Sequence, residues 1–143
     1  MPRRPIKRIT VAEVELIAFE LAKKLMEWNE PIPDFETRFP LKLESCIETP
    51  FQTFDRKSLY NGLVAKAAIM FYLMVKNHPF QNGNKRIAVT TLLVFLISNH
   101  RIPKASNQDI YEFARNVAES KPENKDHEIK KINDFIESMS EKV

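Results

Sequence analysis

Residues 63–97 read LVAKAAIMFYLMVKNHPFQNGNKRIAVTTLLVFLI, two long apolar segments separated by a short polar one. Lys66 is the only charged residue between positions 63 and 75, and residues 87–97 carry no charge. Segments this long and this apolar are typical of helices that are surrounded by protein on nearly all sides. We therefore predict two central helices, one from Ser58 to Asn77 and one from Arg86 to Ile97.

The segments on either side of this pair carry helical signals of their own. Thr10 and Glu13 have the spacing of a capping box. Pro40 is placed to start a short helix through Ile47, and further helices are predicted after a capping box at residues 106–109 and over residues 126–139. The apolar residues after Glu13 recur at helical spacing: Val14, Ile17, Leu21, Leu25 and Trp28. The predicted fold class is all-α, with a short β-hairpin around residues 48–56 as its extended part.

The composition fits one mostly helical domain. Of 143 residues only two are glycines, which argues against a glycine-rich dinucleotide-binding loop or a turn-dense β-barrel. The single cysteine, Cys46, cannot form an intramolecular disulfide, and no apolar stretch reaches the roughly 20 residues that a membrane helix needs. We predict a cytoplasmic protein with no membrane partner, consisting of a basic, frayed tail at residues 1–9 and one domain at residues 10–140.

Charge is distributed unevenly along the chain. Between Arg56 and Gln108 there is no Asp or Glu, and eight Lys and Arg residues give this stretch a charge of +8. The remainder holds 14 basic and 19 acidic residues, a net charge of −5. A cationic middle indicates an anionic partner, although an apolar core region that uses Lys and Arg at its few exposed sites would have the same composition. Nucleic acid is not the expected partner, because the basic N-terminal residues lack interleaved aromatic side chains.

The polar loop between the two central helices has the composition of an anion site. Gly83 can take a positive φ and lets a ligand approach the backbone. The next three residues, Asn84, Lys85 and Arg86, open a helix, so their amides point outward at its positive end. Lys85 and Arg86 add two positive charges, which predicts that the bound anion is a phosphate group.

His78 ends the first central helix at the lip of the same loop. Histidine can accept a proton from a hydroxyl group at neutral pH, so His78 is the candidate general base. Taken alone, His78 would more often be a histidine that caps a helix or is satisfied by its neighbours. Phe80 has polar neighbours and is expected to turn into the core and anchor the loop.

Residues 78–86, HPFQNGNKR, resemble the signature of the Fic/Doc family, His-x-Phe-x-(Asp/Glu)-(Gly/Ala)-Asn-(Gly/Lys)-Arg. The resemblance extends from about Thr10 to Phe135 and implies the mainly helical Fic fold. It implies that His78 activates a hydroxyl group of a target protein, and that the loop residues hold the phosphates of ATP: Gly83, Asn84, Lys85 and Arg86. The flap that aligns the target as an added strand is expected at Thr49, Pro50, Phe51, Gln52, Thr53 and Phe54.

Lys85 makes the chain similar to the Doc (death-on-curing) branch, the toxin half of toxin–antitoxin pairs. Adenylyl-transferring members usually have Gly at this position and a second Arg three residues after the first, where Val89 stands in this chain. The resemblance therefore implies transfer of a phosphoryl group from ATP to a Ser or Thr hydroxyl. Elongation factor Tu is the implied target, and inhibited translation is the result. Protein adenylyltransfer (AMPylation) is the alternative reaction.

Asn82 stands where the family has the acidic residue that coordinates Mg²⁺. An amide oxygen can ligate Mg²⁺ but supplies no charge, so a catalytically degenerate module that binds nucleotide or protein is a further alternative. A basic nucleic-acid-binding protein is the third. The family's inhibitory motif, Ser/Thr-x-x-x-Glu-(Gly/Asn), is missing, because Ser120 and Glu123 have a different spacing. Restraint is therefore expected from a separate antitoxin protein.

Overall fold

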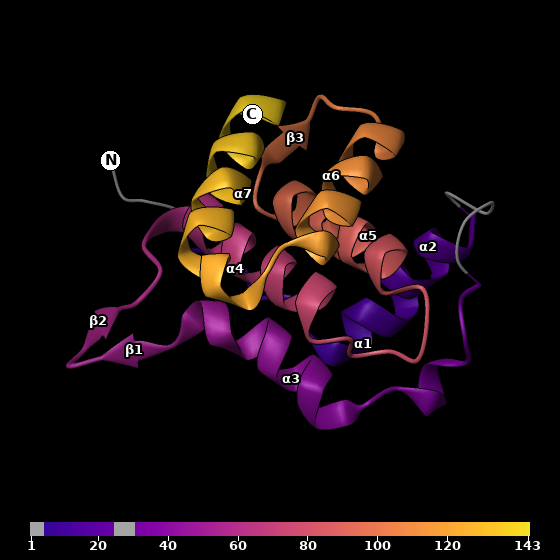
Figure 1. Cartoon of the computed structure of the whole chain (residues 1–143). Helices are drawn as coiled ribbons and strands as arrows, with labels where there is room; N and C mark the ends of the chain where they lie inside the picture. Colours follow the sequence, from indigo (N-terminus) through magenta and orange to yellow (C-terminus); the bar gives the residue numbers. More distant parts are fainter. Residues whose placement is uncertain (1–4, 25–30) are drawn as a thin grey trace.

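The chain is mainly helical, as the sequence predicts. A computed structural model describes residues 5–24 and 31–143 (Figure 1). The N-terminal helix consists of α1 (Val11–Glu13), a π-helical segment (Val14–Phe19) and α2 (Glu20–Lys24). The longer helices are α3 (Pro40–Glu48), α4 (Gly62–Lys76), α5 (Asn84–Ser98), α6 (Asn107–Glu119) and α7 (Lys125–Met139). Short 3₁₀ turns cover Phe35–Thr37, Thr49–Phe51 and Pro122–Asn124.

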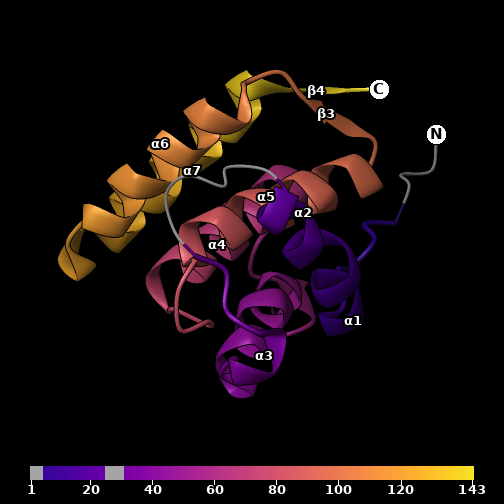
Figure 2. The same cartoon turned by 90° about the vertical axis from the view of Figure 1, so that its right-hand side faces the viewer.

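Helices α4 and α5 form the centre of the molecule. Every residue of α4 from Lys66 to Val75 is buried, and α5 is buried over most of its length. Figure 2 shows α6 and α7 on one side of this pair, and α1, α2 and α3 cover the other side. Coverage on both sides explains why the sequence of α4 and α5 is apolar all round. Within the described residues, no helix combines the length and the hydropathy needed to cross a membrane.

The predicted helices are present, with shifts at their ends. The capping box of α1 is confirmed, since Thr10 Oγ1 accepts from the Glu13 amide at 3.1 Å. Ser106 caps α6 in the same way by accepting from the Asp109 amide. By contrast, α4 begins at Gly62 rather than Ser58, and α5 begins two residues before Arg86.

The π-helical segment changes which face of the N-terminal helix is buried. The sequence spacing places Ile17 on the apolar face, but Ile17 is 43% exposed. A π-helical turn shifts the helical repeat, so that Ala18 and Phe19 are buried instead. Leu25 and Trp28, the last residues of the predicted stripe, lie outside the described residues.

A β-hairpin is present, but it lies further along the chain than predicted. Strand β1 (Thr53–Phe54) pairs antiparallel with β2 (Lys57–Ser58), and the turn residues Asp55 and Arg56 have φ angles of 52° and 63°. Asp is common in tight two-residue turns of this kind, but it is usually followed by Gly rather than Arg, so this pair carries only a weak hairpin signal. The first half of the predicted flap, Thr49–Phe51, forms a 3₁₀ turn after α3 instead. A second strand pair, β3 (Arg101–Pro103) with β4 (Ser140–Lys142), was not predicted.

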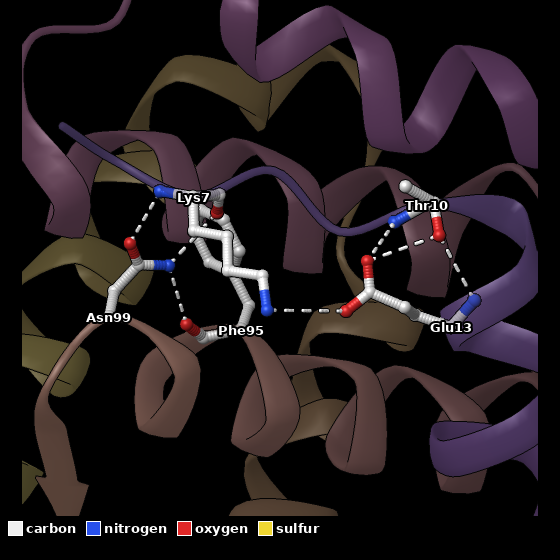
Figure 3. Close-up of polar contacts among 5 residues, drawn as sticks. All are labelled: Lys7, Thr10, Glu13, Phe95 and Asn99. Carbon is white, nitrogen blue, oxygen red and sulfur yellow. Dashed lines mark hydrogen bonds and ion pairs between the residues drawn. The ribbon is translucent and has the colours of Figure 1, made fainter.

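The segment before α1 is held against α5. Asn99 Oδ1 accepts from the Lys7 amide at 2.7 Å, and Asn99 Nδ2 donates to the Lys7 and Phe95 carbonyls at 3.0 and 2.9 Å (Figure 3). Lys7 Nζ lies 3.9 Å from Glu13 Oε2, and Ile9 is buried. The expectation of a frayed tail therefore does not hold from Lys7 to Ile9, because one amide side chain pairs with both backbone groups of Lys7.

At least four of the eight cations in the acid-free stretch donate to backbone carbonyls of the described residues. Lys66 donates to Tyr60, Lys76 to Ala118 and Ser120, Arg86 to Ala22, and Arg101 to Glu137 and Ser140. Most of these carbonyls lie at or near the C-terminal ends of α2, α6 and α7, where a positive charge complements the helix dipole. At least half of the positive charge that indicated an anionic partner is therefore used in contacts within the protein.

Candidate active site

The loop His78–Gly83 joins α4 to α5, and the Asn84 side chain braces it. Asn84 Oδ1 accepts from the Phe80 amide and Asn84 Nδ2 donates to the Phe80 carbonyl, each at 2.9 Å. Asn84 is 6% exposed, so water competes little for either bond. The Asn84 side chain therefore fixes the loop, which leaves only its backbone amide to serve the predicted anion site.

Phe80 anchors the loop in the core, as the sequence predicts. Its side chain is 1% exposed, and the centroid of its ring lies 5.7 Å from that of Phe19 and 5.9 Å from that of Phe35. The three rings connect the loop to the N-terminal helix and to the 3₁₀ turn Phe35–Thr37. Burial of an aromatic ring at this position holds the loop down at its middle.

His78 is exposed at the end of α4, in a backbone conformation that few non-glycine residues adopt. Its φ is +49°, in the left-handed region. His78 Nδ1 lies 3.5 Å from Asn84 Nδ2. When this amide donates, Nδ1 is the accepting nitrogen and the neutral ring carries its proton on Nε2. A base that acts through Nε2 must give up this contact, and a hydrogen bond this long is weak.

Gly83 ends the loop with a φ of +73°. A methyl group at this position would lie 2.7 Å from Ile32 Cδ1 and 3.0 Å from the Pro31 carbonyl oxygen. The close approach that requires glycine is therefore made by Pro31 and Ile32, where the sequence predicted a ligand.

The Arg86 side chain is turned into the protein. It is 3% exposed, and its Nη2 donates to the Ala22 carbonyl. One turn further along α5, Thr90 Oγ1 donates to the Ala18 carbonyl at 2.7 Å. Two successive turns of α5 are thus tied to two successive turns of the N-terminal helix. To reach a phosphate, the Arg86 side chain would have to give up its hydrogen bond to the Ala22 carbonyl. Lys85, in the first turn of α5, is half-buried.

The residues present do not fit a Mg²⁺ ion. Asn82 is exposed, but its Oδ1 accepts from the Gly83 amide at 2.8 Å and so serves the loop itself. Across residues 5–24 and 31–143 no cluster of three or more His, Cys, Asp or Glu side chains could hold a metal. A hard divalent cation prefers several oxygen ligands with carboxylates among them. The described residues of the loop therefore do not provide the carboxylate ligands that Mg²⁺ prefers.

The predicted flap does not lie beside His78. The hairpin precedes the first residue of α4 and the loop follows the last, so the two are found at opposite sides of the molecule (Figure 1). Helix α4 has 15 residues, and such a helix is about 22 Å long. The residues of the flap and the candidate base are therefore not brought together.

A shallow cleft of about 520 Å³, wide open to solvent, lies beside His78 instead. It is lined by Leu41, Lys42, Ser45, Lys76, Asn77 and His78. The sequence does not indicate the three α3 residues, because the apolar spacing of this helix points only to its buried face. An exposed leucine outside that stripe is the signal that could have found them: Leu41 is 80% exposed.

A model of the Fic/DOC family matches residues 10–96, from the capping box of α1 through the loop and into α5. No curated protein and no solved structure matches the chain. The matched range is more than half of the chain and contains the whole loop with His78 and Arg86. Members of the family are generally transferases that take ATP as substrate. The chain belongs to the Fic/DOC family.

Proposed function

We propose that the protein transfers the terminal phosphoryl group of ATP to a Ser or Thr hydroxyl of a target protein, as a Doc-like toxin does. The observation that carries the proposal is the exposed imidazole of His78, which a braced loop presents at the mouth of a cleft inside the range matched by the family. His78 accepts the hydroxyl proton while the oxygen bonds to the γ-phosphorus. The bond from that phosphorus to the β-phosphate oxygen breaks, and ADP leaves.

The start of α5 is the part of the loop that suits the phosphates. The backbone amides of Asn84, Lys85 and Arg86 lie in the first turn of a 15-residue helix, and Gly83 offers no side-chain cap. The positive end of the helix dipole and the Lys85 charge both favour an anion there.

One observation favours phosphoryl over adenylyl transfer. Val89 stands where adenylyl-transferring members usually have a second arginine, and it is fully buried in α5. The position therefore faces the core and cannot supply a cation to a nucleotide. A nucleotide-binding or protein-binding module without activity is the second candidate, because Asn82 stands where the family has its metal-coordinating acidic residue and its Oδ1 accepts from the Gly83 amide.

The remaining proposals concern partners. Elongation factor Tu is the first target to test. A separate antitoxin is proposed to restrain the activity, because Ser120 ends α6 and Glu123 lies in the next 3₁₀ turn, so these residues do not form one inhibitory helix.

The experiment is incubation of the full chain and elongation factor Tu with ATP labelled on the γ- or the α-phosphate, with and without Mg²⁺, followed by the intact mass of the target. We expect a phosphate increment and transfer of the γ label alone. His78→Ala should lower the rate by at least about 10²-fold, while His127→Ala, an exposed histidine on α7, should not. An adenylate increment would identify the alternative reaction, and ATP binding without any increment would identify the inactive module.

A further inference from the structure

We propose that the target segment docks in the cleft between α3 and His78. In this cleft Leu41 and Lys42 select a segment that carries an apolar residue and an acidic residue close to its Ser or Thr. This inference rests on the proposed function and names the class of protein substrate on which that function acts.

The two walls of the cleft are fixed relative to each other. Phe39, directly before α3, donates its amide proton to the carbonyl of Pro79, directly after His78, at 2.8 Å. The first turn of α3 is therefore held beside the candidate base, and a segment bound on α3 brings its next residues to the imidazole. A segment bound only at the hairpin would need roughly seven extended residues to cover the length of α4.

The apolar part of the proposed specificity comes from α3. The helix buries Leu43 and Ile47 in the core, whereas Leu41 is 80% exposed on the side of the cleft. Phe39 is 42% exposed next to it. Two large apolar side chains at the edge of a cleft gain free energy when a partner covers them. An apolar residue of the target is therefore the matching group.

The acidic part comes from the charge of the cleft. Lys42 and His78 line it, and none of its described lining residues is Asp or Glu. Lys76 also lines the cleft, but its ammonium group donates to the Ala118 and Ser120 carbonyls, so Lys42 is the cation that the proposal uses. Lys42 lies in the first turn of α3, whose N-terminus has no side-chain cap, and Lys42 Nζ lies 4.8 Å from the centre of the Phe39 ring. Lysine charge and a helix N-terminus both favour a carboxylate. A basic target segment would be repelled from the same position.

The test is fluorescence anisotropy of labelled ten-residue peptides with the full chain, in the absence of ATP. Each peptide has a central Thr and a neighbouring Leu, and the flanking residues are either Asp and Glu or Lys and Arg. We expect the acidic peptide to bind about tenfold more tightly than the basic one at low salt, with the preference fading as salt is added. Lys42→Glu should reverse the preference and Leu41→Ser should weaken both peptides. Lys130→Glu, at an exposed position of α7, is the matched control and should change neither the affinity for the two peptides nor the preference between them.

Several results would overturn the docking proposal. They are equal affinity for the two peptides, no binding of either peptide, a preference that Lys42→Glu leaves unchanged, and a loss of binding that follows Phe54→Ala on the hairpin instead. A single-stranded oligonucleotide that binds as tightly in a Lys42-dependent way would assign the cleft to nucleic acid. Label transfer from ATP is measured separately on the same peptides, so that peptide binding without transfer would contradict the proposed function and leave the docking preference standing.

Discussion

The guanidinium of Arg86 donates to the backbone carbonyl of Ala22, and this bond joins the signature loop to the N-terminal helix. Ala22 and Ala18 are both fully buried, so small side chains let α5 come close to this helix. The residue that the family resemblance assigns to a phosphate thus holds two helices together in this structure. Binding of a phosphate by Arg86 would exchange one acceptor oxygen for another.

Arg86→Ala is expected to lower the free energy of unfolding by about 2–4 kcal/mol, because it removes a hydrogen bond to a charged group and leaves a cavity. Thr90→Val is the matched variant, since Thr90 ties the neighbouring turn to Ala18 without touching the loop. It should cost about 1 kcal/mol. Urea denaturation measures both. An Arg86→Ala variant as stable as the wild type would show that the bond to Ala22 contributes nothing.

Gly83→Ala is expected to destabilise the protein more than Gly62→Ala. Both glycines have positive φ angles, so each substitution costs about 1 kcal/mol in backbone strain. A methyl group at Gly62 meets nothing within 4 Å, whereas at Gly83 it meets Ile32 Cδ1 at 2.7 Å. We expect about 1–2 kcal/mol of additional cost at Gly83.

Ile32→Val removes the Cδ1 atom and should recover part of that additional cost when combined with Gly83→Ala. The double-mutant cycle, measured by thermal and urea unfolding, gives the coupling between the two positions. A coupling near zero would mean that Ile32 does not press on the loop.

Arg101→Met is expected to cost about 2–4 kcal/mol of stability, because it leaves buried acceptors unpaired. Arg101 Nε donates to Ser140 Oγ at 2.6 Å, and its Nη2 donates to the Ser140 and Glu137 carbonyls at 3.2 and 3.3 Å. Lys104→Met is the control at the same pair of strands, because Lys104 follows β3 and pairs with Glu141 of β4 at the surface. This substitution should change stability little. Equal effects of the two substitutions would contradict an internal role for Arg101.

Lys66 should make the stability of the protein depend on alkaline pH. Burial, and then the charge of Arg8, lower the pKa of Lys66 from its ordinary value of 10.5. The unfolded chain therefore holds this proton more tightly, and the resulting penalty is present at neutral pH and is relieved as the pH rises toward 10.5. The difference in unfolding free energy between wild type and Lys66→Met should shift in favour of the wild type over this range. The difference in unfolding free energy between the wild type and Lys57→Met, a substitution at an exposed position of the hairpin, should not change with pH over this range.

The sequence predicts the central features of the fold because they depend on long patterns. Two apolar segments predict α4 and α5, and nine loop residues point to the family. The capping box at Thr10 is also predictable, since it needs only two side chains at fixed spacing. Features that depend on a single backbone angle are not predicted, as the turn at Asp55 and Arg56 shows. Arginine rarely takes a positive φ, and the turn lacks the Gly that usually follows Asp.

Contacts between residues far apart in the sequence are not predicted for a different reason. That Arg86 binds a carbonyl 64 residues away follows from how helices pack, and residue spacing does not encode it. The same holds for Pro31 and Ile32, which lie where a side chain at position 83 would project. The cleft beside His78 was missed because half of its wall belongs to α3, which carries no motif.

One segment follows the loop along its whole length. Ile32 meets Gly83, the Phe35 ring meets Phe80, and the Phe39 amide binds the Pro79 carbonyl. Residues 32–39 and 79–83 therefore cannot change independently during evolution. Among related proteins, a side chain larger than glycine at position 83 should be accompanied by a smaller one at position 32. Paired changes of this kind would identify residues 32–39 as the segment that packs on the loop, although this segment carries no sequence motif of its own.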